Sequence, residues 1–200
     1  MRKRMGGAAL ITTAAFLAYY TFPSEEEEID VRPHVIEKDL SSLLDEIVVL
    51  PPNQVPITLV DIVDGDTIKD RVNGKMETIR YLLVDTPESK NPYKCIQLYA
   101  KEAFLRNSKL VKSGHLTLEF EQGNTRDSYW RMLAYVYVDG ESIQETLLKE
   151  GYARVAYIMD PPYTYLDQFR EDESLAKKRK INIWSRAYFV TNWGFSGCVP

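Results

Sequence analysis

Apolar and polar residues alternate with a period of two over most of the chain beyond Ile57, which is the pattern of β-strands. Asn73-Gly74 lies between two such runs and predicts a tight hairpin turn. The run 115–121 alternates most regularly, with Leu116, Leu118 and Phe120 on one face and Thr117, Glu119 and Glu121 on the other. The predicted strands are 57–63, 66–72, 75–84, 115–121 and 131–138.

Three further stretches of the same region have the composition and end signals of helices. The first, 97–114, is expected to stop at Gly114. The second, 142–151, begins at Ser142 with Glu145 three residues later, which is a capping box. The third, 164–180, is basic at its C-terminal end, as the helix dipole favours.

The order of these elements is three strands, a helix, two strands and two helices. Five short strands with an inserted helix predict an α+β fold, in which a five-stranded OB-fold β-barrel is packed by three helices. A barrel of this kind removes exposed strand edges by closing on itself, and about 140 residues suffice for its core.

The first 22 residues have a different character and precede this domain. Met5–Phe22 are 18 residues without a charge, close to the minimum that crosses a bilayer of about 30 Å. Basic residues precede this segment and an acidic run follows it, which favours a C-terminus outside the cell. A retained signal-anchor and a cleaved signal peptide both fit, although no clear cleavage site follows the segment. Either way, we expect the rest of the chain to be exported, on the outer face of the membrane or secreted.

Residues 23–56 form a predicted acidic linker, and residues 57–200 the folded domain. Within the linker, Leu40, Leu43, Leu44 and Ile47 recur at helical spacing, so a short amphipathic helix is expected there. The chain has two cysteines, Cys95 and Cys198. Outside the cell a disulfide between them is favoured, with two unrelated thiols as the alternative.

Charge and histidine content exclude several classes of function. The formal net charge is −4, and residues 57–200 hold 20 basic and 20 acidic residues, so no polybasic coat for nucleic acid is present. The two histidines are His34, in the linker, and His115, at a predicted strand start. A two-histidine phosphodiesterase, a Ser-His-Asp hydrolase and an H-E-x-x-H peptidase are therefore unsupported.

Carboxylates and arginines remain as candidate chemical groups. Asp64 and Asp66 flank Gly65, but the twelfth position counted from Asp64 is Lys75, where an EF-hand needs a bidentate Glu. In a barrel the start of the Asp66 strand lies beside the end of the strand that finishes at Asp85. Two carboxylates held together repel unless a cation lies between them, and oxygen ligands favour Ca²⁺ or Mg²⁺.

Two arginines stand at strand ends near these acids. Arg80 opens the stretch IRYLLVDTPES, Glu88 lies near its end, and Arg131 opens RMLAYVYV. Two guanidinium groups facing a metal form a binding site for a phosphoryl group. The alternative is a structural network of arginines and carboxylates without catalysis.

The motifs VDGDTIK, IRYLLVDTPES, RDSYWR before LAYVYVDG, GYARVAYI and INIWS resemble those of the staphylococcal nuclease (thermonuclease) family, in the same order. The resemblance spans roughly residues 57–186. The subgroup with an N-terminal export segment and a paired C-terminal cysteine is nearest.

This resemblance implies an OB-fold enzyme that hydrolyses DNA and RNA with Ca²⁺, prefers single strands, and leaves 3′-phosphorylated ends. By position, Asp66, Asp85 and the backbone carbonyl of Thr86 would bind Ca²⁺, with Asp64 supporting the site. Glu88 would orient or deprotonate the attacking water. The remaining implied roles belong to Arg80 and Arg131, which would bind the scissile phosphate, and to Tyr129 and Tyr157, which would contact the terminal phosphate and the base.

Three positions depart from the family pattern. Ser128 and Trp130 stand where the family usually has Lys and Gly, which removes a cation and adds an aromatic ring. Met159 replaces a second stacking tyrosine. Trp130 either replaces the lost stacking or covers the barrel, and we favour the second interpretation because aromatic side chains are more often buried.

The sequence therefore predicts an exported, membrane-anchored or secreted, Ca²⁺-dependent nuclease. The main alternative is a catalytically inactive OB-fold module that binds nucleic acid or protein. A third hypothesis is a metal-dependent phosphatase that acts on small nucleotides. The expected partners are DNA, RNA and the membrane, and the residues support no inference about a protein partner.

Overall fold

The computed structural model describes residues 51–89, 95–123, 125–159 and 162–199. They belong to one compact unit that begins at Val48. The predicted membrane segment, His34, and residues 23–50 of the predicted linker, including its expected short helix, lie outside the described residues. The first strand begins at Gln54, so the last residues of the predicted linker belong to the folded domain. Within the described part of the chain, no helix is long and apolar enough to cross a membrane.

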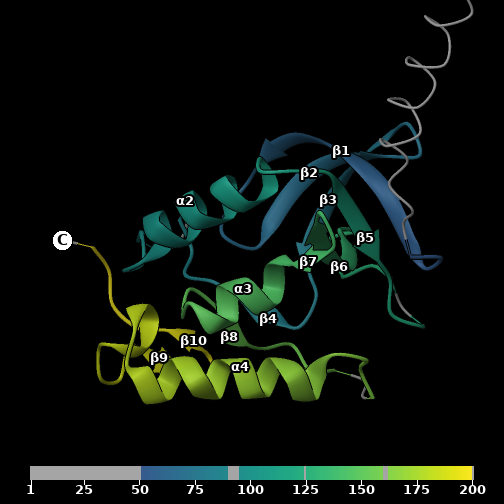
Figure 1. Cartoon of the computed structure of the whole chain (residues 1–200). Coiled ribbons are helices and arrows are strands. Elements are labelled where there is room, and N and C mark those ends of the chain that lie inside the picture. Colours follow the sequence, from purple (N-terminus) through teal and green to yellow (C-terminus); the bar gives the residue numbers. More distant parts are fainter. Residues whose placement is uncertain (1–50, 90–94, 124, 160–161, 200) are drawn as a thin grey trace, which may run out of the picture. The chain divides into compact units, whose positions relative to one another are not determined.

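Five strands form a closed barrel, as the sequence predicts (Figure 1). The antiparallel order β3-β2-β1-β5-β6 is closed by a parallel pairing of β3 with β6, in which Arg80 is opposite Leu133. A two-residue strand, β7 (Glu141–Ser142), extends the sheet beside β6. The barrel strands are β1 (Gln54–Ile62), β2 (Thr67–Val72), β3 (Lys75–Tyr81), β5 (Leu116–Glu119) and β6 (Met132–Val138).

The predicted hairpin turn joins β2 and β3. Asn73 and Gly74 have φ angles of 49° and 78°, the two positive values that a tight two-residue turn between antiparallel strands needs. The resulting register puts Thr67 opposite Arg80. The start of β2 and the end of β3 are thereby held side by side, next to the loop that contains Asp64 and Asp66.

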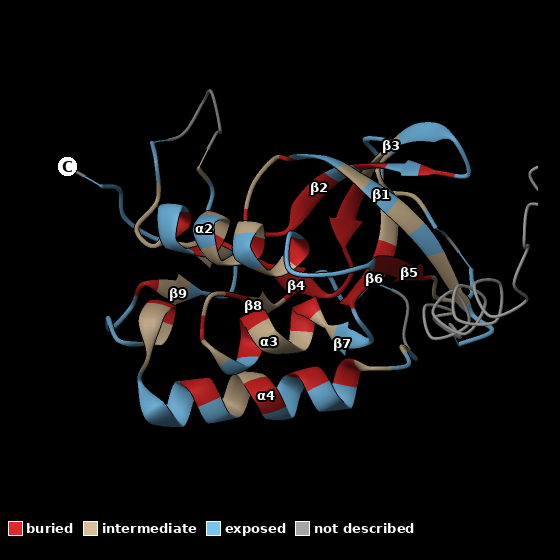
Figure 2. Cartoon of the chain, turned by 45° about the horizontal axis from the view of Figure 1, so that its top comes forward, coloured by how far each residue is buried: buried red, intermediate tan, exposed pale blue. Residues whose placement is uncertain are grey.

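Buried residues of the strands form the core of the barrel, and Figure 2 colours them red. On β2 the inward positions are Ile68, Asp70 and Val72, while Lys69 and Arg71 are exposed. The prediction for 115–121 needs one correction, because all four residues of β5 are buried. The polar face of this strand is covered as well, and the hydroxyls of Tyr137 and Tyr165 donate hydrogen bonds to Glu119 at 2.9 Å.

The predicted strand 75–84 is not continuous. Strand β3 ends at Tyr81, and the chain turns at Leu82 and Leu83, with a φ of 64° at Leu83. It then forms β4 (Val84–Asp85), which pairs with β8 (Arg154–Val155). Both leucines are buried, so hydrophobicity alone conceals the turn.

Three helices pack beside the barrel: α2 (Ala100–Val111), α3 (Ile143–Lys149) and α4 (Leu166–Arg179). The Ser142 cap is confirmed, because its hydroxyl accepts a hydrogen bond from the Glu145 N–H at 3.2 Å. Helix α2 is shorter than predicted and ends before Gly114. A Cβ atom at Gly114 would lie 1.8 Å from Asp139 Oδ2, so this glycine serves close packing rather than the helix stop.

The C-terminal tail folds back on the domain after a 3₁₀ turn, η1 (Asn182–Trp184). It forms a small hairpin of β9 (Val190–Thr191) and β10 (Gly194–Phe195), which the sequence patterns do not predict. Cys95 and Cys198 form the favoured disulfide, with their Cα atoms 5.6 Å apart. The tail is thus fixed to the chain segment just before α2.

Candidate active site

The D-G-D loop between β1 and β2 holds the first acidic residues of the site. Asp64 Oδ1 accepts a hydrogen bond from the Asp66 N–H at 3.1 Å, and the Asn107 side chain on α2 donates to the Asp64 carbonyl at 2.9 Å. Gly65 packs so closely that a Cβ atom there would lie 2.6 Å from Thr86 Oγ1. A glycine is therefore required for the loop to approach the chain at Thr86.

Asp66 and Thr86 come together as the sequence predicts, although 20 residues separate them. Asp66 Oδ2 accepts hydrogen bonds from the Thr86 N–H at 2.8 Å and from the Thr86 hydroxyl at 3.1 Å. Thr67 donates its hydroxyl to the other carboxylate oxygen at 3.1 Å. The buried Asp66 carboxylate is thus fixed in orientation by its neighbours.

Arg80 lies between the two predicted cation ligands. Its Nη2 is 3.2 Å from Asp66 Oδ2 and 3.6 Å from Asp85 Oδ1. Its Nη1 donates to the carbonyls of Tyr81 and Val84 at 2.9 and 2.8 Å. These two carbonyls flank the turn between β3 and β4. Burial disfavours the charge of Arg80, but the carboxylates of Asp66 and Asp85 outweigh it and raise the pKa of the guanidinium.

Asp85 has a second arginine partner, Arg154, that we did not assign from the sequence. Asp85 and Arg154 are opposite each other in the β4–β8 pair, and Arg154 Nε donates to Asp85 Oδ2 at 2.9 Å. Tyr157 reaches the other oxygen of Asp85 with its hydroxyl at 3.4 Å. The signal for Arg154 was its place in the motif GYARVAYI, but only the strand pairing reveals what it contacts.

Several carboxylates of the site are held close to one another in a region poor in water. Burial, and then the charge of Asp66, raise the pKa of Asp64 to about 7. The same two causes raise the pKa of Asp85 and of Glu88. Mutual repulsion of this kind is what a bound cation relieves.

Glu88 and Arg131 lie on the exposed side of the site. The Glu88 residue is exposed, although part of its carboxyl surroundings is buried. This partial burial and the charge of Asp66 raise its pKa, and the charges of Arg80 and Arg131 offset the rise only in part. Arg131 Nε donates to Asp127 Oδ2 at 2.7 Å, and its guanidinium lies 5.5 Å from the centre of the Tyr129 ring. Arg131 is thus held outside the group formed by Asp66, Arg80 and Asp85.

The aromatic residues named from the sequence differ in their surroundings. Tyr157 is half exposed, with its ring 5.2 Å from the Arg80 guanidinium carbon. Tyr129 and Met159 are largely exposed. The interpretation of Trp130 as a cover for the barrel is wrong, because this residue is 78% exposed. It lies at a turn, with a φ of 63°.

The residues present fit a hard cation such as Ca²⁺. Asp66, Asp85 and the Thr86 carbonyl supply oxygen donors only. The pKa values of Asp64 and Asp85 are raised first by burial and then by the charge of Asp66, so a cation among these groups would favour their charged forms. In the described part of the chain, no three His, Cys, Asp or Glu side chains are grouped closely enough to hold a metal by themselves. A cation here would therefore need the backbone carbonyl and water in addition to the two carboxylates.

A closed OB-fold barrel with paired carboxylates and arginines at the ends of β2, β3 and β4 defines a nuclease-like class of protein. Residues 78–186 match the family model described as staphylococcal nuclease homologue. The chain belongs to this family. The matched range begins after the D-G-D loop and contains Arg80, Asp85, Glu88 and Arg131.

Named relatives support the assignment. The chain is 60% identical to the endonuclease YncB of Bacillus subtilis over 145 residues, and the matched part is 72% of this chain and 69% of that protein. A prophage-derived endonuclease of the same organism, YokF, is 58% identical over 145 residues, and the matched part spans about half (49%) of its length. The thermonuclease of Staphylococcus hyicus is 35% identical over 133 residues, 66% of this chain and 78% of that protein.

Proposed function

We propose that this chain is a Ca²⁺-dependent nuclease that cleaves phosphodiester bonds in DNA and RNA, prefers single strands, and leaves 3′-phosphorylated ends. The observation that carries the proposal is the position of Arg80, within 3.2 Å of Asp66 and 3.6 Å of Asp85. A guanidinium fixed between two cation ligands lies where a phosphate bound to that cation would be. The names of the relatives, endonuclease and thermonuclease, agree with it.

In this proposal Asp66, Asp85 and the Thr86 carbonyl bind the cation, and Asp64 stabilises the loop from which Asp66 projects. Bound Ca²⁺ would supply Lewis-acid polarisation of a phosphoryl oxygen. Arg154 keeps Asp85 in place through the bond from its Nε. Arg80, whose Nη1 is fixed on two carbonyls, needs no rearrangement to donate to a phosphate oxygen.

Glu88 and Arg131 act on the reacting groups. Glu88, which is exposed to water, orients a water molecule and accepts its proton. The water oxygen bonds to phosphorus, and the bond from phosphorus to the 5′ oxygen breaks, so the phosphate remains on the 3′ side. Arg131 stabilises the negative charge that grows on the phosphate oxygens.

Tyr129 and Tyr157 are the proposed substrate contacts beyond the scissile phosphate. Tyr129 lies next to Arg131, and the Tyr157 ring lies against Arg80. Each tyrosine thus exposes an aromatic ring beside one of the two phosphate-binding arginines. A base stacked on such a ring gains contact area regardless of its identity, which favours unpaired strands of either DNA or RNA.

The alternative functions account less well for these residues. An inactive binding module has no need of a buried group of Asp66, Arg80 and Asp85, because unpaired or imperfectly compensated charges in a protein interior are costly. A small-nucleotide phosphatase would need the same group but not the exposed tyrosines. The nuclease accounts for both features.

We also propose that the protein acts outside the cytoplasm, anchored through residues 5–22 or secreted. The apolar N-terminal segment and the Cys95–Cys198 disulfide support this, since such bonds persist in oxidising compartments. Fractionation of cells that express the full chain, followed by protease treatment of intact cells, tests it. Protection of the domain from added protease would contradict the proposal.

The test of the enzymatic proposal is cleavage of denatured DNA and of RNA by the full-length chain, with Ca²⁺ and after addition of a chelator. We expect cleavage that the chelator abolishes and that Ca²⁺ restores, with 3′-phosphate ends found by mass spectrometry of the products. Glu88→Ala should lower kcat by about 10². Cleavage that persists with the chelator, or an intact substrate with Ca²⁺, would reject the assignment.

A further inference from the structure

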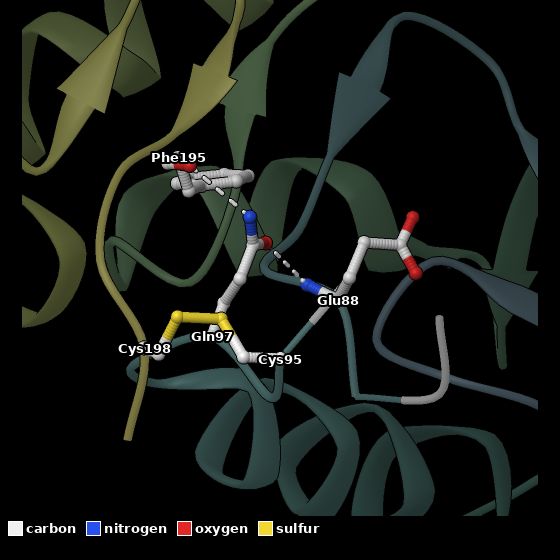
Figure 3. The surroundings of a disulfide bond; sticks show 5 residues. All are labelled: Glu88, Cys95, Gln97, Phe195 and Cys198. Carbon is white, nitrogen blue, oxygen red and sulfur yellow. Dashed lines mark hydrogen bonds between the residues drawn. A yellow bond between two sulfur atoms is a disulfide. The ribbon is translucent and has the colours of Figure 1, made fainter. Parts of the chain in front are cut away.

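The C-terminal tail lies beside the loop that carries Glu88, and several bonds connect the two. Besides the disulfide, the Val199 N–H donates to the Ile96 carbonyl at 2.8 Å, and Gln97 forms a β-bridge with Cys198. Within the tail, the Ser196 N–H donates to the Phe189 carbonyl at 2.8 Å. The hairpin of β9 and β10 is therefore fixed onto the segment 95–97 (Figure 3).

Gln97 connects this tail to Glu88 through both ends of its side-chain amide. Its Nε2 donates to the Phe195 carbonyl at 3.1 Å, and its Oε1 accepts from the Glu88 N–H at 2.7 Å. Its backbone N–H also donates to the Glu88 carbonyl at 3.1 Å. Figure 3 shows the Gln97 side chain between Phe195 and the Glu88 backbone, while the Glu88 carboxylate points away from both.

Glu88 needs this support because its own side chain does not provide it. The carboxylate is exposed, so packing does not fix the residue as it fixes the buried Asp66 and Asp85. Gln97 satisfies both backbone groups of Glu88 and leaves the carboxylate free. The point of the backbone from which the Glu88 side chain projects is thereby fixed, while the carboxylate stays accessible to water.

Phe195 also reaches the cation ligands, by a separate contact. The Arg154 guanidinium lies 5.7 Å from the centre of the Phe195 ring, and Arg154 in turn donates to Asp85. The carbonyl of Phe195 is thus connected to Glu88 through Gln97, and its ring to Asp85 through Arg154. One residue of the tail contacts the supports of both ends of the segment 85–88.

We propose that Gln97 is a positioning residue for Glu88, and that the Cys95–Cys198 disulfide maintains it by keeping Phe195 in place. This inference rests on the role of Glu88 in the proposed function. Gln97 does not touch substrate or reacting atoms; it acts through the backbone of Glu88. Loss of either the Gln97 amide or the disulfide should therefore affect the chemical step rather than substrate binding.

The first test does not depend on activity. Hydrogen exchange of the Glu88 amide, followed by NMR, should become at least about tenfold faster in Gln97→Ala than in the wild type, because the N–H loses its acceptor. Gln122→Ala, an exposed glutamine, is the control and should leave this rate unchanged. An unchanged rate in Gln97→Ala would overturn the inference, whether or not the protein proves to be a nuclease.

The second test measures catalysis. Gln97→Ala should lower kcat by about tenfold with KM unchanged, a loss of the size of one positioning hydrogen bond. In a Glu88→Ala background the same change should have no further effect on kcat. Gln97→Glu keeps an acceptor for the Glu88 N–H but loses the donor to the Phe195 carbonyl, so it should recover only part of kcat. Full additivity with Glu88→Ala, or no recovery by Gln97→Glu, would assign Gln97 a structural role only.

The third test addresses the disulfide, whose cysteines are both exposed and so accessible to a phosphine reductant. Reduction, or the pair of changes Cys95→Ser and Cys198→Ser, should lower kcat by about threefold to tenfold in the wild type. It should change kcat little in Gln97→Ala, where the connection is already broken. Equal losses in both backgrounds would show that the disulfide does not act through Gln97.

Discussion

Arg80 and Arg131 are proposed to bind the same phosphate, yet they are held in opposite ways. Arg80 is 7% exposed and is fixed by two carbonyls and two carboxylates. Arg131 is partly exposed and is held by Asp127, four residues away in the same loop. We call the group of Asp66, Arg80 and Asp85 the buried side of the site, and Glu88, Tyr129 and Arg131 the exposed side.

This difference indicates a division of work. Groups of the buried side are preorganised, and they also contribute to folding, because each compensates the charge of another. Groups of the exposed side contribute little to stability and are free to adjust to the substrate. Substitutions should therefore separate the two sides by their effects on stability and on catalysis.

The largest effect is expected for Arg80→Ala, which should lower both properties. It removes the donor to two carbonyls and the positive charge between the two buried carboxylates, which keep only their other hydrogen bonds. We therefore expect a loss of about 3 kcal/mol in the free energy of unfolding and at least about 10² in kcat. Urea unfolding and steady-state kinetics measure the two. Arg80→Lys keeps the positive charge but not the planar guanidinium with its several donors. Compared with Arg80→Ala, it should restore stability more than it restores kcat. A fully stable Arg80→Ala protein would contradict the division.

Arg131→Ala should lower kcat by about 10² but the free energy of unfolding by less than about 1 kcal/mol, because its ion pair is partly exposed. Arg106→Ala is a matched control, since Arg106 also pairs with a carboxylate, Glu150, at the surface. The control should keep full activity. If Arg131→Ala destabilised the fold as much as Arg80→Ala, the exposed side would be structural too.

Asp70 tests whether a buried carboxylate without a partner destabilises the fold at neutral pH, in contrast to the compensated charges of the buried side. It is buried on β2, and neither carboxylate oxygen has a hydrogen-bond partner among the described residues. Burial raises its pKa to about 7, so the folded state binds a proton that the unfolded state has released above pH 4. Stability is then complete below pH 4, falls as the pH rises to 7, and is constant above it.

Asp70→Asn removes this titration while keeping the size of the side chain. Its free energy of unfolding relative to the wild type should increase by about 2 kcal/mol between pH 5.5 and pH 8, measured by urea unfolding. The activity per folded molecule should not change, because Asp70 contacts none of the proposed catalytic groups. A difference that does not vary with pH would show that Asp70 is ionised in the fold.

The smallest effect is expected for Trp130→Ala. Because the ring is exposed, the free energy of unfolding should change by no more than about 0.5 kcal/mol. If Trp130 extends the exposed side by stacking on a base, KM for single-stranded DNA should rise about fivefold, while kcat stays constant. An unchanged KM would restrict base stacking to Tyr129 and Tyr157.

Local signals accounted for much of the barrel. Asn73-Gly74 fixed the β2–β3 hairpin, and Ser142 with Glu145 fixed the start of α3, because turn and cap chemistry depends on neighbouring residues only. The site residues were named through family motifs, and the structure brings Asp66, Arg80, Asp85 and Thr86 together. Their catalytic roles remain proposals.

Long-range contacts accounted for what was missed. The turn at Leu82-Leu83 lies within an apolar run, and both leucines are buried, so the hydrophobic pattern does not distinguish the turn from a strand. The exposure of Trp130 depends on the turn at which it lies. Arg154, on strand β8, binds Asp85, which is 69 residues away in the sequence. Gln97 binds Phe195 of the C-terminal tail, 98 residues away.

By itself, then, the sequence determined the approximate positions of the five barrel strands, the β2–β3 hairpin, the helix cap and the residue types of the site, because those depend on periodicity and on adjacent side chains. Only the tertiary structure decided which arginine is buried between the carboxylates and which is exposed. It also decided that the C-terminal tail supports Glu88 through Gln97. Such contacts join residues far apart in the chain, and their geometry is fixed only when the barrel closes and the disulfide holds the tail against it.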